Sequence, residues 1–492
     1  MAAPVPVEEA FMTHRRSVPI LVAILSFGGA ACSSSTGGST GEGGSQSTGQ
    51  STGSGGTSTS GSGGTSTTGS GGTPATGSGG TTGTGGAVAT GGATGSTGGV
   101  TGSGGVTSTG GKGGTTGTAG RSGAAGSSGS GGSVATGAKP CDIYAAANTP
   151  CVAAFSTVRV LVSAYKGPLY QVRKGGMNNV FSGKQPIGTV GGTTGGTTQD
   201  IGATADGFAD VAAQEAFCGS EMCTFSKLYD QSGKGNDLTQ APAGQYEQGP
   251  DYEVPATHTV MVGGHKVYSA YFPNPPSLPS GSAPSGYGYR NNKTMGMPTG
   301  SSGAQGVYMV ADGAHSGNAC CFDFGNAETN NGSGPTGAMA ALNLGTSYWG
   351  MGAGSSPWFE GDFEAGVWAG GSSCGTPGSG QLTCSGRKAN PQNPSMKGIP
   401  FAFGILDTGT MNNMPEYVIK TANATTGTLS TAYNGTAPAK WALQGAVVLG
   451  TGGDNSNSSY GTFYEGAVTT GQPSDATDEA IYANIVAAGY GK

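Results

Sequence analysis

Acidic side chains gather in one short stretch in which charged and aromatic residues alternate. An extended backbone over this stretch would place on one face Trp358, Glu360, Asp362 and Glu364. Neighbouring like charges favour protonation of one carboxyl group near neutral pH. A neutral and an ionised carboxyl beside an aromatic ring would suit cleavage of a glycosidic bond. The alternative is an exposed edge strand whose charges discourage aggregation.

A second acidic candidate is Asp454, in the segment Gly452-Gly-Asp-Asn-Ser-Asn457 directly after the apolar run 446–449. Asp and Asn in such a setting are most often turn formers. The same turn would also hold a carboxylate at the end of a buried strand, facing a cleft. The sequence leaves both interpretations open.

The nine cysteines are spaced as four local pairs plus Cys32. The expected disulfides are Cys141–Cys151, Cys218–Cys223, Cys320–Cys321 and Cys374–Cys384. A bond between the adjacent Cys320 and Cys321 would close a strained ring, which indicates a position that surrounding structure and function hold. Metal ligation is the alternative, but none of the four histidines stands at a zinc-like spacing from a cysteine pair. We therefore expect no metal.

The N-terminus predicts export. Basic His14-Arg-Arg16, a short apolar run and the small residues before Cys32 follow the order of a secretory signal. The segment resembles a bacterial lipobox, so we expect residues 1–32 to be a signal and Cys32 to be lipidated; ordinary cleavage without lipid is the alternative. Residues 33–139 are almost only Gly, Ser, Thr and Ala, which predicts a disordered linker.

Residues 140–492 predict one all-β domain, a sandwich. Short β-rich runs separated by turns lie at 158–162, 260–262, 307–310, 401–406, 417–419, 446–449 and 463–468. Two helices are expected, at Asp210–Phe217 and Thr477–Ala488, the second ending at Gly489. The net charge of −6 and the lack of a basic stripe argue against a nucleic-acid partner.

The globular part resembles the catalytic domain of the α-L-arabinofuranosidase B family, glycoside hydrolase family 54. The most specific shared segments are the block that opens with Cys320-Cys321 and runs to Thr329, and Gly452 to Asn457 in the same order. Further similarity lies in Cys141-Asp-Ile-Tyr, Thr149-Pro-Cys-Val-Ala-Ala, Tyr229 to Pro242, Tyr289-Arg-Asn-Asn292 and Gly461-Thr-Phe-Tyr-Glu-Gly466. The resemblance implies a concanavalin-like β-sandwich (jelly roll) that releases terminal α-L-arabinofuranosyl groups with retention of configuration.

The resemblance also assigns site residues. It implies Glu364 as the nucleophile and Asp454 as the general acid/base. It implies contacts with the sugar from Asp362, Trp349, Gly453 and the vicinal disulfide Cys320–Cys321. A retaining mechanism needs two carboxyl groups about 5–5.5 Å apart, so the fold must bring these distant acids together. No organic cofactor is implied.

Three departures separate this chain from the family. Ala365 and Gly366 stand where the family has two asparagines that contact the sugar, and the 374–384 loop looks like an insertion. No sequence like the arabinose-binding module of fungal members follows the last helix, so we expect targeting through the N-terminal tether. The expected partners are arabinan, arabinoxylan or their oligosaccharides, met by a secreted or surface-anchored enzyme. A non-catalytic carbohydrate-binding sandwich and a surface spacer are the alternatives.

Overall fold

The computed structural model describes residues 137–175, 181–182, 185–186, 195–245, 250–275, 286–345, 350–364, 366–371 and 388–492. The residues in these ranges are mostly β, with three short helices. Among them, no helix is long and apolar enough to cross a membrane.

The first of two large sheets has the strand order β1-β23-β12-β19-β20-β21, and β10 also pairs with β23. All its pairings are antiparallel. Its strands are β1 (Cys151–Ser156), β10 (Ala270–Phe272), β12 (Gln305–Ser316), β19 (Ala402–Met411), β20 (Met414–Asn423), β21 (Thr426–Thr436) and β23 (Gly461–Thr469).

The second sheet has the order β17-β16-β14-β13-β22-β11-β7 and is antiparallel throughout. Its strands are β7 (Thr239–Gln240), β11 (Tyr289–Asn291), β13 (Asp323–Ala327), β14 (Ala340–Gly345), β16 (Trp358–Asp362), β17 (Val367–Trp368) and β22 (Ala446–Leu449). Almost every residue of β13, β14, β16 and β22 is buried, so this sheet is covered on both faces.

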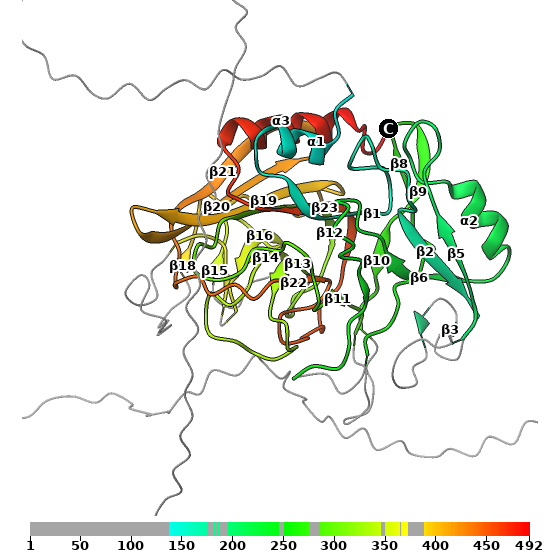
Figure 1. The fold of residues 1–492 in the computed structure, drawn as a ribbon, viewed down its shortest axis with the longest axis horizontal. Helices are drawn as coiled ribbons and strands as arrows, with labels where there is room; N and C mark the ends of the chain where they lie inside the picture. Colours follow the sequence, from blue (N-terminus) through cyan, green and yellow to red (C-terminus); the bar gives the residue numbers. More distant parts are fainter. Residues whose placement is uncertain are drawn as a thin grey trace, which may run out of the picture. The chain divides into compact units, whose positions relative to one another are not determined.

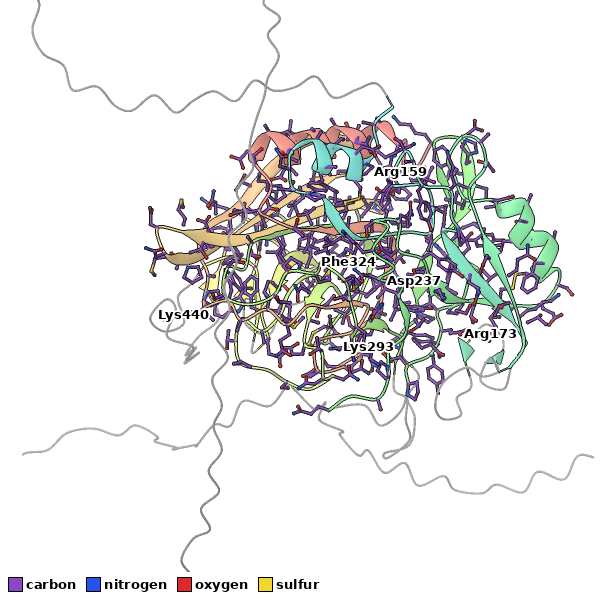
Figure 2. All side chains as sticks on the ribbon, in the orientation of Figure 1. Arg159, Arg173, Asp237, Lys293, Phe324 and Lys440 are labelled. Carbon is purple, nitrogen blue, oxygen red and sulfur yellow. A yellow bond between two sulfur atoms is a disulfide. The ribbon has the colours of Figure 1, made fainter. Side chains whose placement is uncertain are left out.

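The two sheets pack face to face around an aromatic core, with β13, β14 and β16 of the second sheet below β12, β19 and β23 of the first (Figure 1). Phe324 of β13 meets Phe155 and Phe463 of the first sheet at ring distances of 6.2 and 5.3 Å. The Phe363 ring lies 4.9 Å from that of Tyr417. Phe324 (labelled in Figure 2) faces the aromatic core. Because successive side chains of a strand point to opposite faces, its neighbour Asp323 lies on the other face of the sheet.

Smaller elements surround these sheets. A three-stranded sheet joins β5 (Thr197–Ile201), β2 (Tyr170–Lys174) and β6 (Cys223–Leu228), and α2 (Val211–Cys218) packs beside it. The remaining pairs are β3 (Phe181–Ser182) with β4 (Gln185–Pro186), β8 (Thr259–Val262) with β9 (His265–Tyr268), and β15 (Gly350–Met351) with β18 (Lys388–Ala389).

Helices α1 (Pro140–Ala146) and α3 (Asp475–Ala487) lie side by side on the outer side of the first sheet (Figure 1). The Ser474 hydroxyl accepts a hydrogen bond from the Thr477 amide, and this cap starts α3. Ile481 and Ile485 bury the apolar stripe, and Gly489 ends the helix with a φ of +77°. The predicted helices at 210–217 and 477–488 are therefore present.

The predicted strand at 158–162 is wrong. Val158, Val160 and Leu161 are buried, but the segment bends after β1 and forms only one isolated bridge, Arg159 with Phe208. Its amides find irregular partners instead: Val160 donates to the Gly207 carbonyl and Leu161 to the Gln231 side chain. Helix α1 was not predicted. It is only two turns long, and the Cys141–Cys151 disulfide joins it to β1.

Candidate active site

The acids occupy the face of the second sheet that points away from the aromatic core. Register places Asp323 of β13 beside Asn343 of β14, and Asn343 beside Glu360 of β16. Strand β16 lies between β14 and β17, and all five of its residues are buried. It is therefore not the exposed edge strand that the sequence allowed. The phenylalanine side chains turn inward as expected, since the Phe359 ring packs against Gly404 of β19.

Glu364 lies two residues beyond the end of β16, in a left-handed conformation with a φ of +64°. The simple alternation expected along this stretch therefore stops at Asp362. The Glu364 amide donates to Oδ1 of Asp362 at 3.0 Å, and the Gly334 amide donates to Oε1 of Glu364 at 3.0 Å. A non-glycine residue with positive φ is uncommon and is held only where its surroundings determine it.

Asp454 lies on the turn that follows β22, and its side chain is 6% exposed. Oδ1 accepts a hydrogen bond of 2.9 Å from the Ser456 amide, so the residue does form the turn. Oδ2 accepts one of 3.2 Å from the Ser333 hydroxyl. The turn-forming interpretation of this segment is confirmed, since one oxygen shapes the turn; the other oxygen is directed toward the loop that contacts Glu364.

Ser333 and Gly334 bring the two acids together. These consecutive residues donate to Asp454 and to Glu364 respectively, so carboxyl groups ninety positions apart in sequence face one loop. Burial, and then the charges of Glu328 and Asp454, raise the pKa of Glu364 to about 9. Ser333 itself is exposed, so solvent or a ligand reaches the loop that joins the two acids.

Arg290 of β11 supports the turn that carries Asp454. The buried guanidinium donates from Nη1 to the Gly452 and Gly453 carbonyls at 3.2 and 2.7 Å, and from Nη2 to the Glu328 carbonyl. Burial lowers the pKa of Arg290 to about 10, although Glu328 and Asp454 oppose that shift. Its Nη hydrogens are directed to backbone carbonyls and its Nε hydrogen to the side-chain oxygen of Asn292, so the cation acts on the surrounding carboxylates without pairing to one.

Asp251 holds the same turn from the other side. Its Oδ1 accepts hydrogen bonds from the side-chain amides of Asn455 and Asn457 at 3.1 and 2.6 Å. Asn455 has a φ of +67°. A cation beneath the turn and a carboxylate beside it therefore hold Asp454 in place.

The structure contains the vicinal disulfide Cys320–Cys321, together with Cys141–Cys151 and Cys218–Cys223. Cys320 and Cys321 are joined by a cis peptide bond. The Cys321 Sγ atom lies 3.3 Å from Oδ2 of Asp362, and the Cys320 Sγ atom lies 3.5 Å from Oγ of Ser456. The disulfide thus contacts the segments that carry both acids. A cluster of Cys320, Cys321 and Asp362 has the spacing of metal ligands, but sulfur atoms bonded to each other are not thiolate ligands.

Asp362 and Asp323 form a second acidic pair beneath the disulfide. Both are buried, Asp323 on β13 and Asp362 on β16, with β14 between these strands. Burial and then the charge of Asp323 raise the pKa of Asp362 well above its ordinary value, and burial raises that of Asp323 as well. A neutral Asp362 has a hydrogen to donate as well as an oxygen to accept, which suits a group that holds a sugar hydroxyl.

The other predicted site residues divide into two groups. Trp349, Ala365, Cys32 and the Cys374–Cys384 pair lie outside the described residues. Gly453 lies beside Glu328, and a β-carbon there would come within 1.9 Å of the Glu328 carboxyl. Gly366 has a φ of +151°, and a β-carbon there would lie 3.0 Å from the indole nitrogen of Trp368.

Sequence reasoning did not assign roles to Ser333, Arg290, Asp251 or Glu328. Arg290 and Glu328 lie in segments that resemble the family, but nothing in their residue types separates them from structural residues. Ser333 lies in a turn rich in Gly, Ser and Asn, where a serine carries no signal of its own. Only the contacts with Asp454 and Glu364 distinguish these residues.

Comparisons with known proteins show the family to which the chain belongs. The family model "Alpha-L-arabinofuranosidase B, catalytic" matches residues 140–491. A "Probable alpha-L-arabinofuranosidase B" of Aspergillus fumigatus is 40% identical over 366 residues, covering 72% of this chain and 62% of that protein. An "Alpha-L-arabinofuranosidase" of Hypocrea jecorina is 42% identical over 365 residues, covering 72% and 63%. The chain thus spans less than two thirds of the length of these relatives.

A solved structure has the same fold. It is described as an arabinofuranosidase complexed with arabinofuranosyl-alpha-1,2-xylobiose. Its TM-score is 0.59 at 39% sequence identity, and the match covers 72% of this chain and 65% of that one. Identity of this size over a shared fold indicates common descent of the whole globular part.

Proposed function

The chain belongs to the alpha-L-arabinofuranosidase B catalytic family, and on that premise we propose that it is a retaining, exo-acting α-L-arabinofuranosidase. The observation that carries the proposal is the convergence of Glu364 and Asp454 on the Ser333–Gly334 loop. A retaining glycosidase requires two carboxyl groups close enough to flank one glycosidic bond, and the contacts of both acids with this loop support such a pair.

In the proposed reaction, the Glu364 carboxylate attacks the anomeric carbon of a terminal arabinofuranose. The Asp454 carboxyl group donates a proton to the glycosidic oxygen as its bond to the sugar breaks. Asp454 then removes a proton from water, which displaces Glu364 with a second inversion and gives net retention. The Gly334 amide donates to Glu364 and stabilises its charged form.

The remaining site residues are proposed to bind the sugar. Asp362 would hold hydroxyl groups, and the Cys320–Cys321 disulfide would provide a flat surface against the ring. Gly453 would let the backbone approach the sugar, and Trp349 would form an aromatic wall. The solved arabinofuranosidase complex contains arabinofuranosyl-xylobiose. We therefore propose arabinan and arabinoxylan oligosaccharides as substrates here.

We also propose the finer features of architecture and location that the sequence predicts. The two sheets would form a concanavalin-like jelly roll. Residues 1–32 would direct export, with a lipid anchor on Cys32, and residues 33–139 would tether residues 140–492 to the cell surface. In this arrangement attachment to the surface brings the enzyme to its polysaccharide.

The decisive experiment replaces Glu364 with Gln and measures kcat/KM on 4-nitrophenyl α-L-arabinofuranoside. An amide cannot form the covalent intermediate, so kcat/KM should fall by at least about a thousandfold. Glu416→Gln is the matched control, because Glu416 is a nearly buried glutamate at the start of β20, in the other sheet. A Glu364→Gln rate near that of the control would exclude the nucleophile role.

A non-catalytic carbohydrate-binding sandwich is the second candidate, since Ala365 and Gly366 stand where the family has asparagines. A binding module gains little from two acids with a shared loop, which favours the enzyme. Proton NMR of the released sugar separates the two: hydrolysis with the α-anomer appearing first supports the enzyme, and no hydrolysis of any arabinofuranoside supports the binder.

A further inference from the structure

A third acid, Glu328, lies within the site and has no place in the mechanism above. It directly follows β13, its side chain is fully buried, and its carboxyl group lies between Gly334, which donates to Glu364, and Gly453, which precedes Asp454. A β-carbon on Gly334 would lie 2.7 Å from its Oε1 atom, and one on Gly453 would lie 1.9 Å from its Oε2 atom. Neither loop leaves room for more than a glycine beside this carboxyl.

Glu328 and Glu364 meet at Gly334. The Gly334 amide donates to Oε1 of Glu364, while the α-carbon side of the same residue faces Oε1 of Glu328. The other charged groups around Glu328 are Arg290 of β11 and Asp362 of β16, and Asp454 faces Glu364. Arg290 donates to the backbone carbonyl of Glu328, not to its carboxyl, and among the described residues no ion pair to this carboxyl is seen.

The surroundings of Glu328 are apolar on the sheet side. Ala327, Met339, Ala341, Ala446 and Val448 form a small separate cluster of buried side chains. The Met339 sulfur and the Glu328 carboxyl approach the same glycine, Gly453. Two carboxylates in such a site would repel strongly, so the pair is expected to hold a proton in the neutral range.

We propose that Glu328 is a positioning residue that acts through Glu364: it accepts the Glu364 proton when the sugar binds and returns it after hydrolysis. This inference depends on the nucleophile role proposed above for Glu364. In the empty site Glu364 carries the proton and donates it toward the Glu328 carboxylate. The charge of Glu328 thereby delays the ionisation of Glu364 until a substrate occupies the site.

The proton balance is complete within the pair. The proton leaves the Glu364 carboxyl and joins the Glu328 carboxylate, which moves the negative charge to Glu364. Glu364 then bonds to the anomeric carbon while Asp454 protonates the departing oxygen. The directions of the pKa shifts agree with this order: burial is the largest influence on both residues, the pKa of Glu328 rises to about 7 and that of Glu364 to about 9.

The test is a carbon-13 NMR titration of protein labelled at the glutamate δ-carboxyl carbons. In the wild type, the signal that disappears in Glu364→Gln should titrate far above the ordinary glutamate range. In Glu328→Gln its midpoint should fall by about one pH unit or more, because the charge that opposes ionisation is gone. Glu416→Gln should leave the midpoint unchanged.

The pH profile of kcat/KM provides a second readout. In the wild type the pair with one proton is active, because that proton moves to Glu328, whereas in Glu328→Gln the proton of Glu364 must leave to solvent; the acid limb should therefore move to higher pH in the variant. A Glu364 NMR midpoint that stays in place or rises in this variant, or an acid limb that moves to lower pH, would overturn the proposal. If Glu328→Gln does not fold, wild-type protein in which every glutamate titrates below about pH 5.5 would overturn it too.

Failure of this inference is distinguishable from failure of the proposed function. The NMR midpoints are measured without substrate, so they decide the coupling of Glu328 to Glu364 in either case. Wild-type protein that does not hydrolyse 4-nitrophenyl α-L-arabinofuranoside would overturn the function. If the wild type is active but the titration midpoint of Glu364 is the same in the wild type and in Glu328→Gln, only the role of Glu328 is overturned.

Discussion

At the scale of single residues, the site depends on backbone positions as much as on side-chain types. Glu364 and Asn455 both have positive φ values. Glu364 is one of the two proposed catalytic acids, and Asn455 directly follows the other, Asp454. Such conformations persist where surrounding contacts determine them. Here the contacts are those of Asp362 and Gly334 with Glu364, and of Asp251 with Asn455.

The acid/base role of Asp454 predicts a dependence on the leaving group. Replacing Asp454 with Asn removes the proton that the departing oxygen needs. We expect kcat/KM to fall by about 10²–10⁴-fold on an arabinofuranosyl oligosaccharide, and far less on 4-nitrophenyl α-L-arabinofuranoside, whose leaving group needs little protonation. Steady-state kinetics on the two substrates measures this ratio. Equal losses on both would argue against the acid role.

At the scale of elements, α3 is fastened to the first sheet through acids that the reaction does not use. The Lys420 ammonium of β20 pairs with Asp478 and Asp475 at the start of α3. Asp407 of β19 lies fully inside the same cluster. Burial, and then the charge of Asp478, raise the pKa of Asp407 well above its ordinary value. The folded state therefore binds this proton more tightly than the unfolded chain does.

A raised carboxyl pKa makes the stability of the fold depend on pH in a known direction. The stabilisation is complete below the unfolded pKa of Asp407, near 4, and is lost as pH rises through the folded pKa. Asp407→Asn removes this titration. The loss of unfolding free energy between pH 5 and pH 8 should therefore shrink by about 1–2 kcal/mol relative to the wild type.

Urea denaturation at the two pH values measures this difference. Asp475→Asn is the control, because that carboxyl is 88% exposed and solvent screens its pairing with Lys420. The same pH dependence in Asp407→Asn and in the wild type would contradict the role of Asp407.

At the scale of the whole molecule, one buried ion pair joins the start of the globular region to its end. The Arg159 guanidinium donates to both carboxylate oxygens of Glu465, on β23, at 2.6 and 2.8 Å. The Tyr308 and Tyr490 hydroxyls donate to the same carboxylate. Arg159 also donates to Asn484 of α3 (Figure 2). Strands β12 and β23 of the first sheet, α3 and the residues that follow α3 thus meet at one polar centre.

Removing the cation from this centre should destabilise the whole domain. Arg159→Met leaves the Glu465 charge buried and uncompensated, which should cost about 3–5 kcal/mol of unfolding free energy. Lys266→Met is the matched control. Its pair with Glu215 has side chains 50% and 44% exposed, so the loss should stay below about 1 kcal/mol. Chemical denaturation of both variants measures their unfolding free energies. Similar losses of unfolding free energy in the two variants would contradict the prediction.

The sequence located most strands but not their partners. The run at 446–449 is β22, and the runs at 307–310 and 463–468 lie inside β12 and β23. The strand prediction at 158–162 was wrong because apolar composition indicates burial but not strand pairing. The backbone amides of this segment donate to the carbonyl of Gly207 and to the side chain of Gln231, not to a neighbouring strand. Helix α1 escaped prediction because seven residues, one of them proline, carry little periodicity.

The candidate site also has features that the sequence predicts and features that only the tertiary structure shows. Residue types and their order in the chain were enough to select the acidic stretch ending at Glu364, the turn with Asp454 and the vicinal cysteines, because the chemistry of these groups depends on what they are. The tertiary structure alone decided that Ser333 and Gly334 join the two acids, and that Arg290 and Glu328 surround them. These contacts arise when separate strands of one sheet end at the same place, and a linear pattern does not record where folded segments meet.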